Sequence, residues 1–157
     1  MKSKKLVMAA VFAALTFVGT SVIKIPTING YIHPGDGFVL LAGFLLGPLF
    51  GGLSAGIGSA LADLLGGYGI YVPGTFLIKG LTALVAAVIY QRKKSFPFAL
   101  LGAIVAELVM TAGYFLYETL IFGEGASLSI PGNLVQGAGG VVISLLLLPI
   151  IKRIFKS

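Results

Sequence analysis

The chain has 157 residues, of which 57% are hydrophobic and only 10% are charged, with a mean hydropathy of +1.05 and a formal net charge of +6. Soluble proteins carry about half apolar and a quarter charged residues, so this composition excludes a water-soluble fold. The absence of cysteine excludes disulfides and thiolate metal sites. The basic residues form short clusters without interleaved aromatic residues, which favours a role in membrane topology over nucleic-acid binding.

Six apolar stretches, separated by turn or charge signals, predict an all-α integral membrane protein with six transmembrane helices in a single domain over residues 1–157. Lysines precede the first stretch, but no cleavage site follows, so we interpret it as a retained helix and not as a signal peptide. The second and third stretches are short and joined by a tight turn, so five spans is the alternative. The stretches cover residues 5–23, 37–50, 51–66, 72–90, 96–122 and 131–151.

The positions of the basic residues distinguish between six and five transmembrane spans. They gather at the N-terminus, between the fourth and fifth stretches, and at the C-terminus. The positive-inside rule places all three clusters in the cytoplasm, which requires an even number of spans between successive clusters. Six spans meet this condition and five do not. We therefore expect a multi-pass protein of the bacterial cytoplasmic membrane with both termini cytoplasmic. The clusters are Lys2, Lys4, Lys5, Arg92, Lys93, Lys94, Lys152, Arg153 and Lys156.

Small residues recur at helical spacing in the first stretch, where Ala9 and Ala13 form one pair and Ala10 and Ala14 another. Small faces let helix backbones approach closely in lipid, where no hydrophobic force drives association. Two interpretations are open: the face packs inside the protein, or it docks a partner membrane protein.

Three successive predicted helices each carry one polar face at i, i+4, i+7 or similar spacing. Polar groups in lipid are costly and tend to face a cavity, so these faces predict a binding pocket that opens to the outside. In the alternative interpretation Lys79 and Glu107 form a structural ion pair and the hydroxyls bond backbone carbonyls. The faces are Thr75, Lys79 and Thr82; Glu107, Thr111, Tyr114 and Glu118; and Asn133 with Gln136.

The first external loop, residues 24–36, is long and holds the single histidine, His33. It is a candidate lid over the pocket, with His33 either a ligand contact or an interfacial hydrogen-bond partner. Asp36 is expected either to cap the next helix or to contact ligand. Tyr68 and Tyr71 flank the next external loop and fit either an aromatic membrane belt or a wall for a flat ring.

Enzymatic signatures are absent: the sequence has no H-E-x-x-H, G-x-S-x-G or Walker A segment. One histidine without cysteine cannot build the usual nucleophile and base arrangements, and the acids are too few and scattered for a two-metal site. We therefore expect no catalytic residues, no metal and no cofactor.

Residues 30–37 (GYIHPGDG), 46–68 and 73–80 resemble the substrate-binding S components of energy-coupling factor vitamin transporters, and the resemblance covers most of the chain. It implies a six-helix subunit that captures a vitamin at the outer face and works with a transmembrane coupling subunit, the T component, and two cytoplasmic ATPases. The family's alanine motif, which contacts the coupling subunit, matches the alanine face of the first helix.

Family members bind ligand between the external loops and the outer halves of the last three helices, where the polar faces lie. The predicted substrate-binding residues are His33, Tyr71, Thr75, Lys79, Glu107, Thr111, Tyr114, Asn133 and Gln136. The closest branch is associated with riboflavin, hydroxymethylpyrimidine and pyridoxine. Few aromatic residues are expected around the cavity, which favours pyridoxine or hydroxymethylpyrimidine over riboflavin. Other open alternatives are a self-sufficient secondary carrier, proton-coupled through Glu107, and a membrane binding protein that transports nothing.

Overall fold

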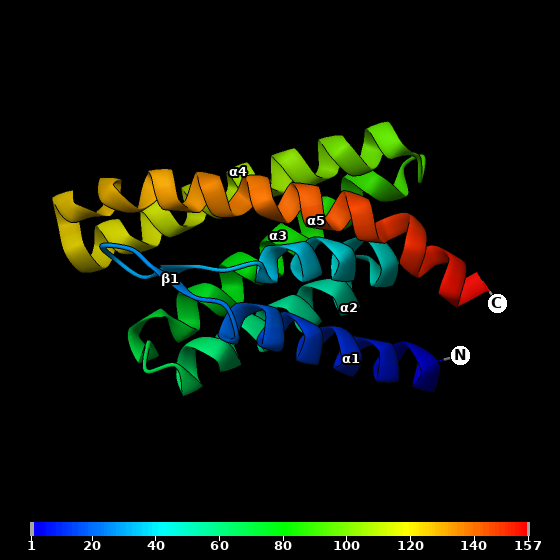
Figure 1. Cartoon of the computed structure of the whole chain (residues 1–157), viewed down its shortest axis with the longest axis horizontal. Coiled ribbons are helices and arrows are strands. Elements are labelled where there is room, and N and C mark those ends of the chain that lie inside the picture. Colours follow the sequence, from blue (N-terminus) through cyan, green and yellow to red (C-terminus); the bar gives the residue numbers. More distant parts are fainter. Residues whose placement is uncertain (1, 157) are drawn as a thin grey trace.

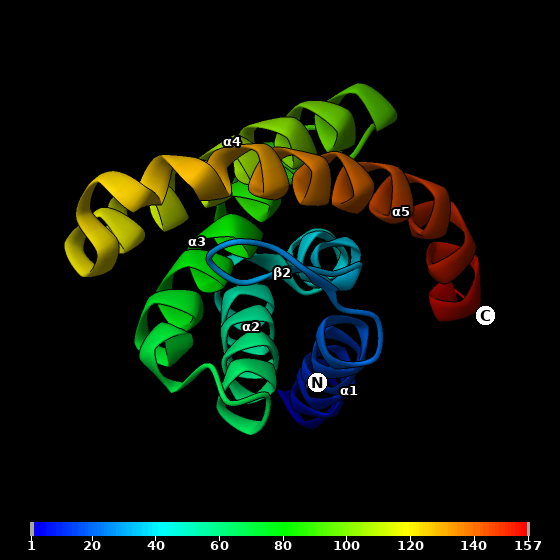
Figure 2. The same ribbon diagram turned by 60° about the vertical axis from the view of Figure 1, so that its left-hand side comes forward.

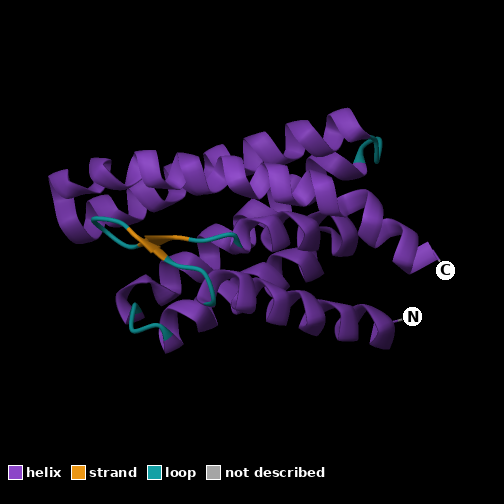
Figure 3. Cartoon of the chain, viewed as in Figure 1, coloured by secondary structure: helices purple, strands orange, loops and turns teal. Residues whose placement is uncertain are grey.

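A computed structural model describes residues 2–156, and helices dominate it (Figures 1 and 3). The predicted all-α class is confirmed in that nearly all of the described chain is helical and several helices are long and apolar. One element was not predicted: a short antiparallel hairpin in the first external loop, in which Ile25 pairs with Ile32. In chain order the elements are α1 (Lys2–Ser21), β1 (Ile25–Pro26), β2 (Tyr31–Ile32), α2 (Gly35–Leu65), η1 (Gly69–Tyr71), α3 (Val72–Gln91), α4 (Phe96–Phe122), η2 (Gly123–Ser129) and α5 (Ile130–Lys156).

Helix α2 is broken in the middle. Gly47 has non-helical backbone angles, φ 84° and ψ −176°, and Pro48 follows it. Positive φ is accessible to glycine without a Cβ clash, and proline lacks the N–H that would continue the helical ladder. The break therefore separates two helical segments and lies within the turn predicted over residues 46–52.

The surface polarity is inverted relative to that of a soluble protein. Lys79 and Asp36 are 0% exposed, whereas Leu120 is 85% and Leu65 is 73% exposed. Lipid tails solvate such apolar side chains, and polar groups in a membrane turn inward. Within the described residues, four helical stretches are long and apolar enough to cross a membrane: Ser3–Ser21, Gly35–Leu65, Gly69–Gln91 and Phe96–Ile154, the last of which contains α4 and most of α5.

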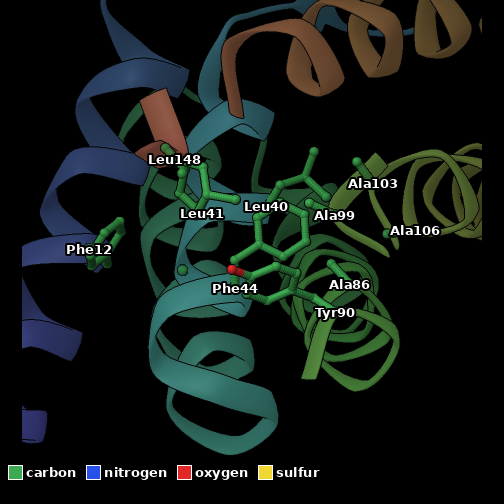
Figure 4. Packing of buried hydrophobic residues seen from close by; sticks show 11 residues of the cluster. Phe12, Leu40, Leu41, Phe44, Ala86, Tyr90, Ala99, Ala103, Ala106 and Leu148 are labelled. Atoms are coloured by element: carbon green, nitrogen blue, oxygen red, sulfur yellow. The ribbon is translucent and has the colours of Figure 1, made fainter. Parts of the chain in front are cut away.

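The core is built largely from small side chains. Ala99, Ala103 and Ala106 of α4 are fully buried against Ala86 of α3, with Tyr90 packed nearby against Phe44 (Figure 4). Alanine lets helix backbones come close, which is the main source of packing energy between helices in lipid. Helices α4 and α5 run side by side, and α1, α2 and α3 pack on one side of them (Figures 1 and 2).

The start of α1 and the end of α5 lie at the same end of the molecule, and the basic loop that joins α3 to α4 lies there too (Figure 1). The hairpin and η2 lie at the opposite end. The three basic clusters are thus gathered at one end, and the first external loop is at the other.

Candidate functional site

A polar pocket lies at the end of the molecule opposite the basic clusters. It is formed where the hairpin meets the end of α2, η1, the start of α3, the end of α4 and the start of α5. The cavity itself is small, about 50 Å³, and the space widens to about 490 Å³ when open solvent at its mouth is included. The lining residues are Thr27, Asn29, Gly30, Tyr31, Ile32, His33, Asp63, Tyr68, Tyr71, Thr75, Tyr114, Glu118, Ser129, Gly132, Asn133 and Gln136.

The hairpin covers one side of the pocket and is held there by hydrogen bonds to neighbouring elements. The Asn29 side-chain amide donates to the carbonyl of Gly125 in η2 at 2.8 Å, and the Tyr71 hydroxyl donates to the Asn29 carbonyl. The Tyr31 hydroxyl donates to Asp63 Oδ1 at 2.7 Å, and burial beside this carboxylate raises the pKa of Tyr31. The loop therefore covers the pocket, as a lid would, through contacts with α2, η1 and η2.

Below the pocket, a buried ion pair joins α2 to α3. Lys79 Nζ lies 2.5 Å from Asp36 Oδ1, with both side chains 0% exposed. The other Asp36 oxygen accepts a hydrogen bond from Gln136 Nε2 at 2.8 Å. A charge buried this deeply is tolerated only when it is paired and its remaining lone pairs are satisfied, and both conditions are met here.

Gln136 connects this ion pair to the hairpin. Its amide oxygen accepts a hydrogen bond from the His33 backbone N–H at 3.1 Å. The His33 ring accepts, through Nδ1, a hydrogen bond from the Gly35 N–H at 3.1 Å, and burial lowers the pKa of His33 to about 3. The imidazole is therefore neutral at physiological pH and holds the end of the loop in place.

Two expectations for Asp36 and Lys79 are corrected. Asp36 does not cap α2, whose N-cap is Pro34 without a side-chain hydrogen bond; the carboxylate instead points to Lys79. The ion pair considered for Lys79 and Glu107 is formed by Lys79 and Asp36. Two helices that are distant in sequence meet here, and residue spacing within each helix does not reveal their approach.

Glu107 is 5% exposed and neither of its carboxyl oxygens has a hydrogen-bond partner among the described residues. It lies against the glycine face of α5: a Cβ added at Gly137 or Gly140 would come within 3.2 Å of its oxygens or its own Cβ. A Cβ at Gly140 would also lie 2.8 Å from the Asp36 Cβ. Glycine at these positions therefore allows α5 to approach α4 and α2 closely.

The structure separates the predicted binding residues into two groups. His33, Tyr71, Thr75, Tyr114, Asn133 and Gln136 line the pocket, whereas Lys79, Glu107 and Thr111 do not. The Thr111 and Thr82 hydroxyls donate to the carbonyls of Glu107 and Ile78, four residues earlier in their own helices. For these two hydroxyls the alternative interpretation, bonding to backbone carbonyls, describes the structure.

Some lining residues lie outside the predicted substrate-binding set. Asp63, near the end of α2, was not predicted. Glu118 was placed on the polar face of α4 with Tyr114, and it lines the pocket. The expectation of few aromatic residues is wrong, because four tyrosines line the pocket: Tyr31, Tyr68, Tyr71 and Tyr114. The Tyr31 and Tyr68 rings are 4.8 Å apart.

A second, apolar groove runs between α1 and the second half of α2. Ala10 and Ala14 are exposed in it, while the opposite face of α1 packs inside through Phe12 and Thr16. Internal packing therefore does not use the whole alanine face. The lining residues are Leu6, Ala9, Ala10, Ala13, Ala14, Phe17, Phe50, Leu53, Ser54, Ile57, Leu61 and Leu65.

Comparison with known proteins identifies several relatives. Residues 1–153 match the family model described as "ECF-type riboflavin transporter, S component". The solved structure titled "Structure and mechanism of the S component of a bacterial ECF transporter" has a TM-score of 0.80 and 27% identity, with full coverage of both chains. The thiamine precursor transporter HmpT of Lactococcus lactis subsp. cremoris (strain MG1363) is 29% identical over 96% of this chain and 89% of its own length. An uncharacterised Pyrococcus woesei protein from the gap 3′ region is 33% identical over 77% of this chain and 82% of its own.

Proposed function

The chain belongs to the S-component family of energy-coupling factor transporters, and on this basis we propose that it binds a small vitamin precursor in the polar pocket and imports it. S components are substrate-binding subunits of transporters, so the predictions that the chain is not an enzyme and that it is a multi-pass protein of the bacterial cytoplasmic membrane are confirmed. The observation that carries the proposal is the pocket, which is lined by polar side chains inside an otherwise apolar protein.

In the proposed topology the protein is one domain with six spans, and the pocket faces outward. The break at Gly47 divides α2 into two spans, and α1, α3, α4 and α5 supply the others. The basic clusters at the opposite end then lie in the cytoplasm together with both termini. A pocket at the outer end is where a substrate-capturing subunit would need it.

For the substrate, we propose hydroxymethylpyrimidine, with pyridoxine as the nearest alternative. The similarity to a thiamine precursor transporter supports the first choice. The tyrosine walls provide surfaces on which a flat ring can stack. Riboflavin stays an alternative, because the family model carries its name and the aromatic lining removes our argument against a flavin.

We further propose that the chain works with a T component and two cytoplasmic ATPases, as the family implies. The apolar groove that exposes Ala10 and Ala14 is the proposed contact with the T component. Small side chains on an exposed helix face permit close backbone contact with a partner helix in lipid. Lys79, Glu107 and Thr111 are kept as proposed substrate-binding residues, although they lie outside the pocket lining.

Two experiments test the proposal. Mass spectrometry of small molecules that copurify with the protein would identify the ligand, and calorimetric titration would rank hydroxymethylpyrimidine, pyridoxine and riboflavin. Uptake into liposomes would then be measured with and without the coupling module and ATP. Uptake that requires both supports the proposal. Accumulation by the chain alone would favour a self-sufficient carrier, and binding without any uptake would favour a non-transporting binding protein.

A further inference from the structure

Two buried polar atoms of the pocket have no hydrogen-bond partner in the part of the chain that the structure describes. Glu118 is 3% exposed; its Oε1, 3.2 Å from the Tyr71 hydroxyl, shares the single proton of that hydroxyl with the Asn29 carbonyl, and its Oε2 is buried without a partner among the described residues. The Asn133 Nδ2 group is likewise buried and unpartnered. Most buried polar atoms in proteins are hydrogen-bonded, and an orphan costs about 1–3 kcal/mol. One acceptor and one donor of the same pocket are therefore left for a ligand to satisfy.

The pocket is also acidic. Asp63 and Glu118 contribute two carboxylates to the lining, and among the described residues no lysine or arginine lines it. The nearest cations lie behind the lining: Lys79 pairs with Asp36 and is 5.2 Å from the centre of the Tyr114 ring, and Lys24 is 4.3 Å from the centre of the Tyr31 ring. The His33 ring is neutral, since burial lowers its pKa to about 3. A ligand that enters this pocket thus meets negative charge without a compensating cation in the lining.

We propose that the pocket selects an unphosphorylated heteroaromatic amine, whose amino group donates to Glu118 Oε2 while a neighbouring ring nitrogen or hydroxyl oxygen accepts from Asn133 Nδ2. This inference rests on the proposed function and narrows it to one class of substrate. An amino group beside a ring nitrogen presents a donor next to an acceptor, the pair that amide side chains read on adenine. The bond to Glu118 is charge-assisted, which makes it stronger than a neutral one.

The same lining excludes a phosphate ester. A phosphate monoester carries about −1.5 to −2 charges at neutral pH. Placed near Asp63 and Glu118, with no lining cation to pair it, it would be repelled and incompletely solvated. The unphosphorylated form is thus the transported one, and a kinase-type reaction must add any phosphate after uptake.

The test compares three ligands by calorimetric titration of the purified full-length protein: an aminated hydroxymethylpyrimidine, its analogue with an oxo group in place of the amine, and the phosphate ester of the first. We expect the amine to bind roughly 10- to 100-fold more tightly than the oxo analogue, as the loss of a charge-assisted hydrogen bond predicts. We expect the ester to bind at least as weakly as the oxo analogue. An ester that binds as tightly as the free amine would overturn the inference.

Variants of Glu118 and Asn133 test whether these side chains contact the amine. Glu118→Gln keeps an oxygen for the Tyr71 hydroxyl but removes the negative charge. Its amide group can also donate a hydrogen bond to the oxo analogue. We therefore expect the preference for the amine over the oxo analogue to shrink about tenfold or more. Asn133→Asp should weaken binding of the amine by a similar factor. Glu124→Gln, an exposed acid at the same end, is the control that should bind like the wild type. An unchanged preference in folded Glu118→Gln would refute the assignment.

Failure of this inference can be told apart from failure of the proposed function. If the wild-type protein binds pyridoxine or riboflavin but none of the aminopyrimidines, the inference is wrong and the S-component function stands. If no vitamin binds and none is taken up with the coupling module, the proposed function itself fails, and the inference with it.

Discussion

The buried ion pair between Lys79 and Asp36 makes a sharp prediction about stability. Replacing Lys79 by methionine keeps much of the side-chain volume but removes the charge 2.5 Å from Asp36 Oδ1. The carboxylate, 0% exposed, then keeps only the hydrogen bond from Gln136. The free-energy cost of an uncompensated buried charge is far larger than the stabilisation that the ion pair provided.

The expected magnitude follows from this geometry. Breaking a buried pair by removing one partner costs about 3–5 kcal/mol. For a chain of this size each kcal/mol lowers the melting temperature by roughly 2–4 °C, so Lys79→Met should melt roughly 6–20 °C below the wild type. The double variant Lys79→Met/Asp36→Asn removes both charges, and we expect it to recover most of this loss.

The assay is thermal unfolding of all variants in the same lipid nanodiscs, followed by ligand titration of those that fold. Lys93→Met, at an exposed position in the basic loop, is the matched control and should stay within about 0.5 kcal/mol of the wild type. The reasoning would be refuted if Lys79→Met were as stable as this control, or if the losses of Lys79→Met and Asp36→Asn, each measured alone, simply added in the double variant. A folded Lys79→Met protein with unchanged affinity would further show that Lys79 is not a ligand group.

Three other predictions follow from single features. The pKa of His33 is about 3 in the folded protein and 6.5 in the unfolded chain, so between these pH values only the unfolded chain protonates the ring. The His33 contribution to stability is therefore complete above pH 6.5, and the free energy of unfolding should fall by about 2 kcal/mol at pH 5. This pH dependence should be weaker in His33→Gln. Gly140→Ala places a Cβ 2.8 Å from the Asp36 Cβ and should lower the free energy of unfolding by about 1–3 kcal/mol. Gly139→Ala is the control, because a Cβ there meets no described atom within 4 Å. Equal unfolding temperatures of the two variants would contradict the close packing at Gly140. Ala10→Leu should leave ligand affinity intact but reduce copurification of the T component, and undiminished copurification would place that contact elsewhere.

The sequence predicted the helices well because membrane spans are long and their composition is strongly constrained. A run of about 20 apolar residues between charged or turn residues has few alternatives in lipid. The position of the α2 break was less certain: residues 46–52 contain several glycines, and only the backbone angles at Gly47 identify the one that turns the chain. The strands of the hairpin, Ile25–Pro26 and Tyr31–Ile32, are too short to give an alternating pattern.

For the pocket, the sequence indicated the faces but not the contacts. The spacing of Thr75, Tyr114, Asn133 and Gln136 placed each on the polar side of its helix, and all four line the pocket. The partner of Lys79 depends on how closely α2 approaches α3, which no pattern within one helix encodes. The aromatic lining was predicted in part: Tyr71 and Tyr114 were named as binding residues and Tyr68 as a candidate wall. Tyr31 was missed because it comes from the hairpin, where periodicity gives no direction.

The side chain of Gln136 has one further consequence. Its oxygen holds the His33 backbone and its nitrogen holds Asp36, so a single amide acts as a latch between the outer lid and the charged centre of the bundle. If the lid lifts to admit or release cargo, the His33 N–H leaves the Gln136 oxygen, and the hydrogen bond from Gln136 to Asp36 loses its anchor in the loop. We therefore expect lid opening to loosen the protein at its middle as well as at its mouth, and hydrogen exchange at the His33 amide would rise together with that of the first turn of α2.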